Sequence, residues 1–217
     1  MEGDDVAIEA VIWDFGGVFT TSPFDAFNRY EEREGLPRHF IRTVNATAPD
    51  ANAWALFERA EIDAAGFDAA FLAESTALGH PVRGAHVLPL LSGEVRPAMV
   101  EALCICKRRL KVGCITNNMA HGQRPDGVLD IMDIFDAVIE SSRVGVRKPD
   151  PRIYLKMCET LDVTPEACVY LDDLGINCKP AAALGMTAIK FSSEAQALAD
   201  LGRVTGLAFP RLVEAVA

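Results

Sequence analysis

The sequence predicts an α/β fold, in which helices cover both faces of a parallel sheet and a small helical insertion follows the first strand. From residue 97 onward, short apolar runs alternate regularly with helix-like segments, which is typical of a parallel sheet. Residues 37–90 contain no strong strand pattern and are predicted to form amphipathic helices, because so long a stretch is rarely a structureless loop. We expect a core domain of residues 1–20 and 91–217 and an inserted helical domain of residues 21–90.

Composition limits the classes of partner. The chain has 217 residues and a formal net charge of −10, and half of its residues are hydrophobic. The negative charge argues against nucleic acids and anionic membranes, but it is compatible with a small anionic substrate where a metal ion or a lysine supplies local positive charge. No apolar run is long enough to span a bilayer, and the acidic start MEGDD lacks the basic opening of a signal peptide. With six cysteines and no Cys-x-x-Cys pair, we expect a soluble, cytoplasmic protein with free thiols.

The first strand is predicted at residues 7–14, where an apolar run leads directly into Asp14 and then Gly16 and Gly17. Such a run, bounded by glycines, predicts a buried strand that ends abruptly. Ligands bind at the carboxyl ends of parallel strands, so Asp14 is a candidate reactive carboxylate. The glycines would permit a close backbone approach or an unusual turn. Taken alone, the pattern fits an ordinary strand exit equally well.

The segments after this strand are assigned from periodicity and end signals. A helix is predicted at residues 23–35, with Ser22 as its N-cap and Pro23 at its first position. Its aromatic stripe at Phe24, Phe27 and Tyr30 predicts a packed helix face. Further helices are predicted at 53–60, 67–78, 99–109, 151–161, 179–184 and 193–201. Strands are predicted at 111–116, 136–142, 167–171 and 186–191, and a helical patch between 116 and 136.

Polar residues stand at the ends of three predicted strands. These residues, with a lysine that opens a later loop, are Asp14, Thr116-Asn117, Lys148-Pro149 and Asp172-Asp173. Carboxylates from two strands suit an octahedral Mg²⁺ ion. The Thr116 hydroxyl suits phosphate oxygens, and Lys148 suits phosphoryl charge. Asp14 could then attack phosphorus and form an aspartyl-phosphate. Each element alone could be a surface turn, but the complete set in this order favours a phosphoryl-transfer site.

In these motifs the sequence resembles the haloacid dehalogenase-like (HAD) hydrolase superfamily. The motifs are DFGGV at Asp14, TN at Thr116, KP at Lys148 and LDDLGIN at residues 171–177. Over residues 135–207 the chain looks similar to the amino-terminal phosphatase domain of soluble epoxide hydrolase and to the HAD domain attached to some acyl-CoA dehydrogenases. The resemblance implies a Rossmann-like core, Mg²⁺ as cofactor, and an insertion that acts as a cap, closing over the site and selecting the substrate.

The resemblance also implies roles for individual residues. Asp14 would be the nucleophile. The implied metal site comprises Asp14, the main-chain carbonyl of Gly16, Asp173, and Asp172 and Asn177 in support through water or hydrogen bonds. The implied phosphoryl-binding residues are Thr116, Asn117 and Lys148.

One position departs from the family pattern. HAD phosphatases usually carry a second Asp two residues after the nucleophile, and here that position is Gly16. A positioned acid–base group is worth about 10²–10⁴-fold in rate, so we expect slow turnover of alkyl phosphates. Candidate substitutes are Thr20, Thr21, a residue of the cap, and His121 and Arg124 after the TN motif.

These observations predict a Mg²⁺-dependent phosphatase that hydrolyses a small phosphorylated substrate through an aspartyl-phosphate. A catalytically weak or non-enzymatic domain that binds a phosphorylated ligand is the alternative, because of Gly16. A 2-haloacid dehalogenase is less favoured, since that family has an aromatic-containing first motif and does not need the Asp172-Asp173 pair. A monomer and a homodimer are both compatible with the sequence.

Overall fold

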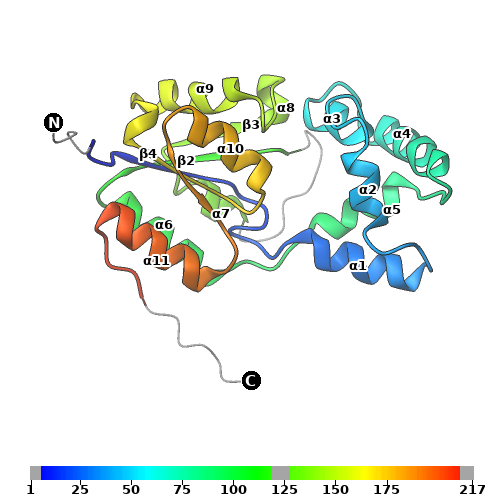
Figure 1. The fold of residues 1–217 in the computed structure, drawn as a ribbon, viewed down its shortest axis with the longest axis horizontal. Coiled ribbons are helices and arrows are strands. Elements are labelled where there is room, and N and C mark those ends of the chain that lie inside the picture. The colour runs from blue at the N-terminus through cyan, green and yellow to red at the C-terminus, as the bar shows by residue number, and fades with distance from the viewer. Residues whose placement is uncertain (1–5, 119–127, 211–217) are drawn as a thin grey trace.

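Five parallel strands form the central sheet of the computed structural model, in the order β3-β2-β1-β4-β5 (Figure 1). The structure describes residues 6–118 and 128–210, except for the side chains of residues 128 and 129. The strands are β1 (Ala10–Trp13), β2 (Lys111–Thr116), β3 (Ala137–Glu140), β4 (Cys168–Asp172) and β5 (Thr187–Lys190). The predicted parallel sheet is confirmed, and β1 lies between β2 and β4 at its centre.

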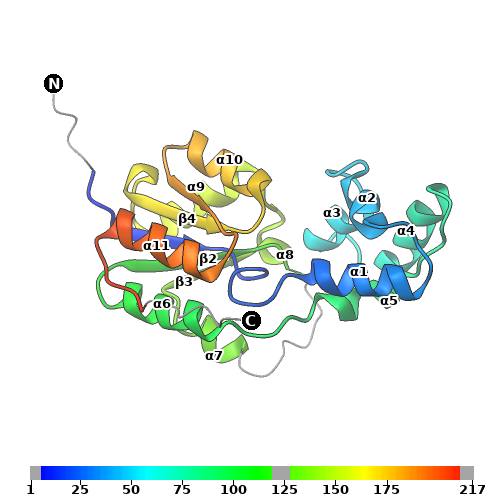
Figure 2. The ribbon, with the colours of Figure 1, turned by 60° about the horizontal axis from the view of Figure 1, so that its bottom comes forward.

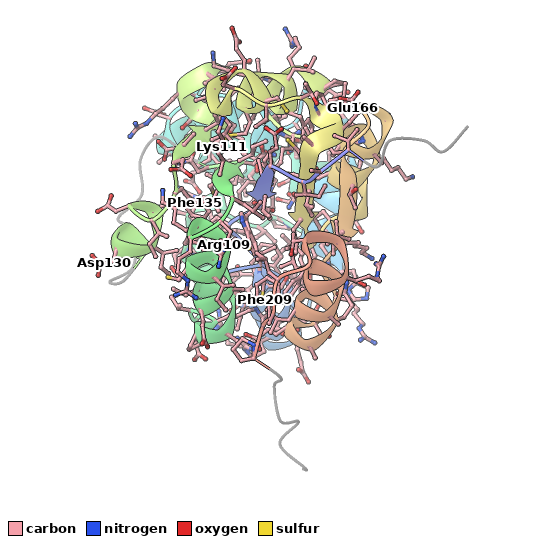
Figure 3. The ribbon with its side chains drawn as sticks, turned by 90° about the vertical axis from the view of Figure 1, so that its left-hand side faces the viewer. Arg109, Lys111, Asp130, Phe135, Glu166 and Phe209 are labelled. Carbon is pink, nitrogen blue, oxygen red and sulfur yellow. The ribbon has the colours of Figure 1, made fainter. Side chains whose placement is uncertain are left out.

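Helices cover both faces of this sheet (Figures 1 and 3). On one face lie α6 (Pro97–Lys107) and α11 (Glu194–Thr205), and on the other lie α9 (Pro151–Leu161) and α10 (Gly175–Ala183). Side chains of β1 alternate between the two layers: Val11 and Trp13 pack into the core with α6 and α11, while Ala10 and Ile12 pack with α9. Figure 3 views the end of the sheet at which β2 begins, where Lys111 and Arg109 lie.

The insertion is a layer of helices with an apolar core of its own, beyond the end of the sheet at which β1 ends (Figures 1 and 2). Its elements are α1 (Pro23–Arg33), α2 (Phe40–Ala46), α3 (Ala53–Glu58), α4 (Ala64–Ala77), α5 (Gly84–Val87) and a 3-10 turn at Leu88–Leu91. The Ser22 side chain accepts a hydrogen bond from the Phe24 amide, as predicted for an N-cap. Phe27 and Tyr30 are buried in this core. Within the described segments, no helix combines the length and apolarity needed to cross a membrane.

Two short segments join the insertion to the core. Thr20 pairs with Val95 in an antiparallel bridge. The Thr21 amide donates to the Glu94 carbonyl at 2.8 Å, and the Glu94 amide donates to the Thr21 hydroxyl at 3.0 Å. The Thr21 hydroxyl, a candidate proton donor from the sequence, is therefore bonded at this junction.

Several predicted boundaries are wrong by two to four residues, among them the start of the first strand, which is Ala10 rather than residue 7, and the start of α4, which is Ala64 rather than residue 67. Ser141 and Ser142, expected in the third strand, belong to the short helix α8 (Ser141–Val144). Helix α10 begins at Gly175 rather than at 179, directly after a turn in which Asp172 accepts the Leu174 amide hydrogen. Helix α11 continues to Thr205. At Ser141 and at the start of α10, the boundary coincides with side-chain contacts, and the periodicity of the sequence gives no information about such contacts. The predicted helical patch before β3 includes α7 (Val128–Met132).

Candidate active site

Lys148 lies at the centre of the candidate site. Its Nζ atom is 2.7 Å from Oδ1 of Asp14 and 2.8 Å from Oδ2 of Asp172, and the residue is 1% exposed. Asp14 directly follows β1, Asp172 ends β4, and these strands are paired with Trp13 opposite Leu171. The sheet thus brings both carboxylates to one edge, as the sequence predicted.

Asp172 anchors this cluster through several donors. Besides Lys148, its carboxylate accepts hydrogen bonds from the Tyr170 hydroxyl at 2.5 Å, the Leu174 amide at 2.8 Å and Asn177 Nδ2 at 3.1 Å. Burial opposes ionisation, but Lys148 and these hydrogen bonds together lower the pKa of Asp172. With so many donors on its two oxygens, Asp172 is suited to hold Lys148 in place. Tyr170 was missed by the sequence analysis, although it stands two residues before Asp172 and so faces the same side of the strand.

The carboxylates form a site suited to a divalent cation. Asp14, Asp172 and Asp173 each offer an oxygen, and these three oxygens lie within 4.8 Å of one another. Burial, with the neighbouring Asp172 charge, raises the pKa of Asp173 to about 6 and also raises that of Asp14. When all three carboxyl groups are ionised, they and the Lys148 ammonium group together carry two excess negative charges. A hard divalent cation such as Mg²⁺ matches this charge and these oxygen donors.

The two glycines that follow Phe15, Gly16 and Gly17, have distinct roles. Gly17 adopts a φ angle of 77°, in the region that favours glycine. A methyl group at position 17 would overlap the Asp173 carboxylate. A methyl group at position 16 would meet no atom within 4 Å. Gly17 therefore leaves room for the Asp173 carboxylate, whereas a Cβ atom at position 16 would lie in open space.

The residues predicted to hold a phosphoryl group lie at the same edge. Thr116 ends β2 and is buried. Asn117 binds the main chain of Lys148 at both ends of its amide: Oδ1 accepts from the Lys148 amide at 2.8 Å, and Nδ2 donates to the Lys148 carbonyl at 3.1 Å. In this structure Asn117 thus positions the lysine, and direct binding of phosphate by Asn117 stays a prediction. His121 and Arg124 lie outside the described residues.

A carboxylate from the insertion also reaches this edge. Glu58, the last residue of α3, accepts hydrogen bonds at Oε2 from Arg147 Nε at 2.6 Å and from Asn117 Nδ2 at 3.2 Å. Its main-chain carbonyl accepts from the Ser141 hydroxyl at 2.6 Å. The sequence analysis missed Glu58, because nothing in its local pattern distinguishes it from an exposed helix-end carboxylate.

Comparison with known proteins agrees with this geometry. A sequence model of the haloacid dehalogenase-like hydrolases matches residues 8–185. The chain is 30% identical over 222 residues to bifunctional epoxide hydrolase 2 of Mus musculus, covering 94% of this chain and 40% of that protein. It is 32% identical over 205 residues to acyl-CoA dehydrogenase family member 10 of Mus musculus, covering 91% of this chain and 19% of that protein. The chain thus spans less than half the length of these two relatives.

A solved structure shares the fold. This is the HAD-family enzyme bt-2542 of Bacteroides thetaiotaomicron, in complex with magnesium and inorganic phosphate. Its TM-score is 0.60 at 18% sequence identity, and the alignment covers 86% of this chain and 95% of that one. The family match over most of the chain, the relatives and the shared fold lead to one conclusion: this chain belongs to the haloacid dehalogenase-like hydrolases.

Proposed function

We propose that this chain is a Mg²⁺-dependent phosphomonoester phosphatase that acts through an aspartyl-phosphate on Asp14. The observation that carries the proposal is the arrangement of the Asp14 carboxylate. Its Oδ1 accepts from Lys148 Nζ at 2.7 Å and from the Phe15 amide at 2.6 Å. No hydrogen bond from a described residue reaches Oδ2, so this oxygen is available to a reactant.

Each part of the site contributes to the proposed reaction. Bound Mg²⁺ would lower the charge on the phosphoryl oxygens and help to orient them, with Asp14, Asp173 and the Gly16 carbonyl as its protein ligands. Asp14 attacks phosphorus, and the bond from phosphorus to the ester oxygen breaks. Lys148 balances charge on the phosphoryl group, and the Thr116 hydroxyl donates to one of its oxygens. Water then hydrolyses the aspartyl-phosphate and releases inorganic phosphate. The insertion would act as the cap that selects the alcohol part of the substrate.

Gly16 supports one alternative. Without a carboxyl group at that position, the ester oxygen leaves without the usual proton donor, so turnover of alkyl phosphates should be slow. The chain could then serve as a catalytically weak or non-enzymatic domain that binds a phosphorylated ligand. A 2-haloacid dehalogenase is disfavoured by the half-buried Asp173 carboxylate, which adds negative charge that carbon–halogen cleavage does not need.

Hydrolysis of an aryl phosphate tests the proposal. Wild type, Asp14→Asn and the control Asp130→Asn, at an exposed position on α7, would be assayed with Mg²⁺ and with chelator. We expect metal-dependent turnover in wild type and in the control, and loss of turnover in Asp14→Asn. Undiminished turnover in Asp14→Asn would rule out the aspartyl-phosphate. Absence of turnover in every variant, with Mg²⁺ and a phosphate mimic still bound, would favour the binding alternative.

A further inference from the structure

Hydrolysis of an aspartyl-phosphate requires a base for the attacking water, and Gly16 cannot supply one. We propose that Glu58, contributed by the insertion, is this base. The inference rests on the proposed phosphatase function and adds a catalytic residue to it.

The first argument is position. Helix α3, which ends at Glu58, lies beside α8 near the edge of the sheet that carries the site (Figures 1 and 2). The Glu58 carboxylate is bonded to Arg147 and Asn117, the chain neighbours of Lys148 and Thr116. It is therefore tied to both segments predicted to hold the phosphoryl group. Water must attack phosphorus roughly in line with the bond to Asp14, from the side opposite Asp14. A residue of the insertion can face that side.

The second argument is the place left open by Gly16. A methyl group there would meet no atom within 4 Å, so no described side chain packs against the Cβ position of residue 16. Thr21, another candidate, is bonded at the junction between insertion and core. Among the residues that the structure describes, Glu58 is the insertion carboxylate bonded to Asn117 at this edge.

The third argument is protonation state. Arg147 and Asn117 both donate to Oε2 of Glu58, which favours the carboxylate form. Burial works in the opposite direction and outweighs the nearby cations Arg147, Lys148 and Arg59, so that the pKa of Glu58 lies above its ordinary value. An ionised carboxylate with a raised pKa is a better base than an exposed one. Within the described segments no hydrogen bond involves Oε1, which leaves this oxygen for water.

The step balances without a further reactant. The water oxygen forms a bond to phosphorus, and the bond from phosphorus to Asp14 breaks, returning its electron pair to the Asp14 carboxylate. The water proton moves to Glu58 and is then lost to solvent. This step uses Glu58 in its carboxylate form, so protonation of the ester oxygen in the first step is not assigned to Glu58. The expected sensitivity of that step to the leaving group is therefore unchanged.

Rapid mixing with an aryl phosphate that has a good leaving group separates the two steps. With Mg²⁺ present, Glu58→Gln should keep a burst of phenol close to one per active site, while its steady-state rate falls about 10²–10⁴-fold. The phosphorylated enzyme should then accumulate and be recovered after acid quenching. The matched control Arg147→Gln removes the ion pair but keeps the carboxylate, and its steady-state rate should change less than tenfold.

Rescue gives a second test that does not depend on loss of activity. Adding Gly16→Asp to Glu58→Gln should restore steady-state turnover and remove the accumulated phosphoenzyme, because a carboxylate again reaches the water. Thermal unfolding and Mg²⁺ binding would confirm that each variant is folded.

Three results would overturn the role of Glu58. They are wild-type turnover in Glu58→Gln, equal effects of Glu58→Gln and Arg147→Gln without phosphoenzyme, or loss of the burst together with the steady state. The last two would assign Glu58 to anchoring the insertion or to substrate binding. Failure of the phosphatase function itself is distinguishable, since it would appear as absent turnover in wild type or as an undiminished burst in Asp14→Asn.

Discussion

Nζ of Lys148 lies 2.7 Å from Oδ1 of Asp14 in a buried ion pair, although the two residues belong to segments far apart in the chain. This ion pair contributes both to the stability of the fold and to the proposed reaction. The same ammonium group that offsets buried negative charge also orients the proposed nucleophile. Substitutions in this cluster should therefore lower both stability and activity, whereas substitutions of neighbouring residues should change only one of these properties.

Replacing Lys148 tests the first part of this relationship. Lys148→Met leaves the Asp14 and Asp172 carboxylates buried without their cation, so we expect the free energy of unfolding to fall by about 3–5 kcal/mol and turnover to be lost. Lys107→Met is the control, because Lys107 and Asp136 form an ion pair with both side chains 38% exposed, worth about 0–1 kcal/mol. Urea denaturation without metal compares the variants. Equal losses would mean that the buried pair adds no special stability.

The two glycines provide a matched pair. Gly17→Ala should cost about 1–3 kcal/mol, because alanine is strained at its positive φ, and it should weaken Mg²⁺ binding by displacing Asp173. Gly16→Ala should change stability by only about 0.5 kcal/mol and leave Mg²⁺ binding intact, since its methyl group meets open space. Isothermal titration with Mg²⁺ and thermal unfolding measure both effects. The assignment of Asp173 as a ligand is wrong if Gly17→Ala binds Mg²⁺ as wild type does.

Stability without metal should decrease as the pH rises from about 4 to 6. The pKa of Asp173 is about 6 in the folded protein, against an ordinary value of 3.8. In this window the Asp173 carboxyl group therefore holds more protons in the native state than in the unfolded state, and its contribution to the free energy of unfolding falls with increasing pH. Asp14, whose pKa is also raised, acts in the same direction.

Mg²⁺ should reverse this loss above pH 6, because it binds deprotonated carboxylates. At a concentration of about 100 Kd it would add about 2.7 kcal/mol, or about 5–10 °C in Tm for a chain of this size. Thermal scans at pH 5 and pH 7.5, with and without Mg²⁺, should show the larger shift at pH 7.5. An equal shift at both pH values would contradict the assigned ligands.

Leaving-group chemistry should control the first step. With Gly16 in place of an acid, the burst rate over a series of aryl phosphates should fall steeply as the pKa of the leaving phenol rises. Gly16→Asp should flatten this dependence, since it adds a carboxyl group as proton donor and its Cβ atom would meet no atom within 4 Å. A flat dependence in wild type, with chemistry rate-limiting, would reveal another proton donor.

Two buried tyrosines make hydrogen bonds of different kinds, and comparing their variants tests whether Tyr170 supports the active site or only the stability of the fold. The Tyr170 hydroxyl donates to the Asp172 carboxylate at 2.5 Å, and the Tyr154 hydroxyl donates to the Asn177 carbonyl at 2.8 Å. A hydrogen bond to a charged group contributes about 1.5–3 kcal/mol, against about 0.5–1.5 kcal/mol for a neutral one. Tyr170→Phe should therefore be the more destabilising change and should also lower kcat, while Tyr154→Phe should affect stability alone. Equal kcat values in the two variants would remove Tyr170 from the support of Lys148.

The parallel sheet, and the residues that lie at its functional edge, could be predicted from the amino-acid pattern alone. Strand and helix periods are local, and helical crossovers between parallel strands place all their carboxyl ends at one edge. Asp14, Thr116 and Asp172 could therefore be assigned to a common edge from their positions alone.

How these groups interact is visible only in the folded molecule. It placed Lys148 between Asp14 and Asp172, left Asp173 over Gly17, and brought Glu58 from the insertion to Asn117. Helix α10 also begins at Gly175 rather than at the predicted residue 179. These features depend on contacts between segments distant in the chain. Local periodicity carries no information about such contacts, because they form only when the insertion packs beside the sheet edge. Burial of an unpaired charge is costly, so the buried charges there are stabilised by ion pairs and hydrogen bonds between these segments.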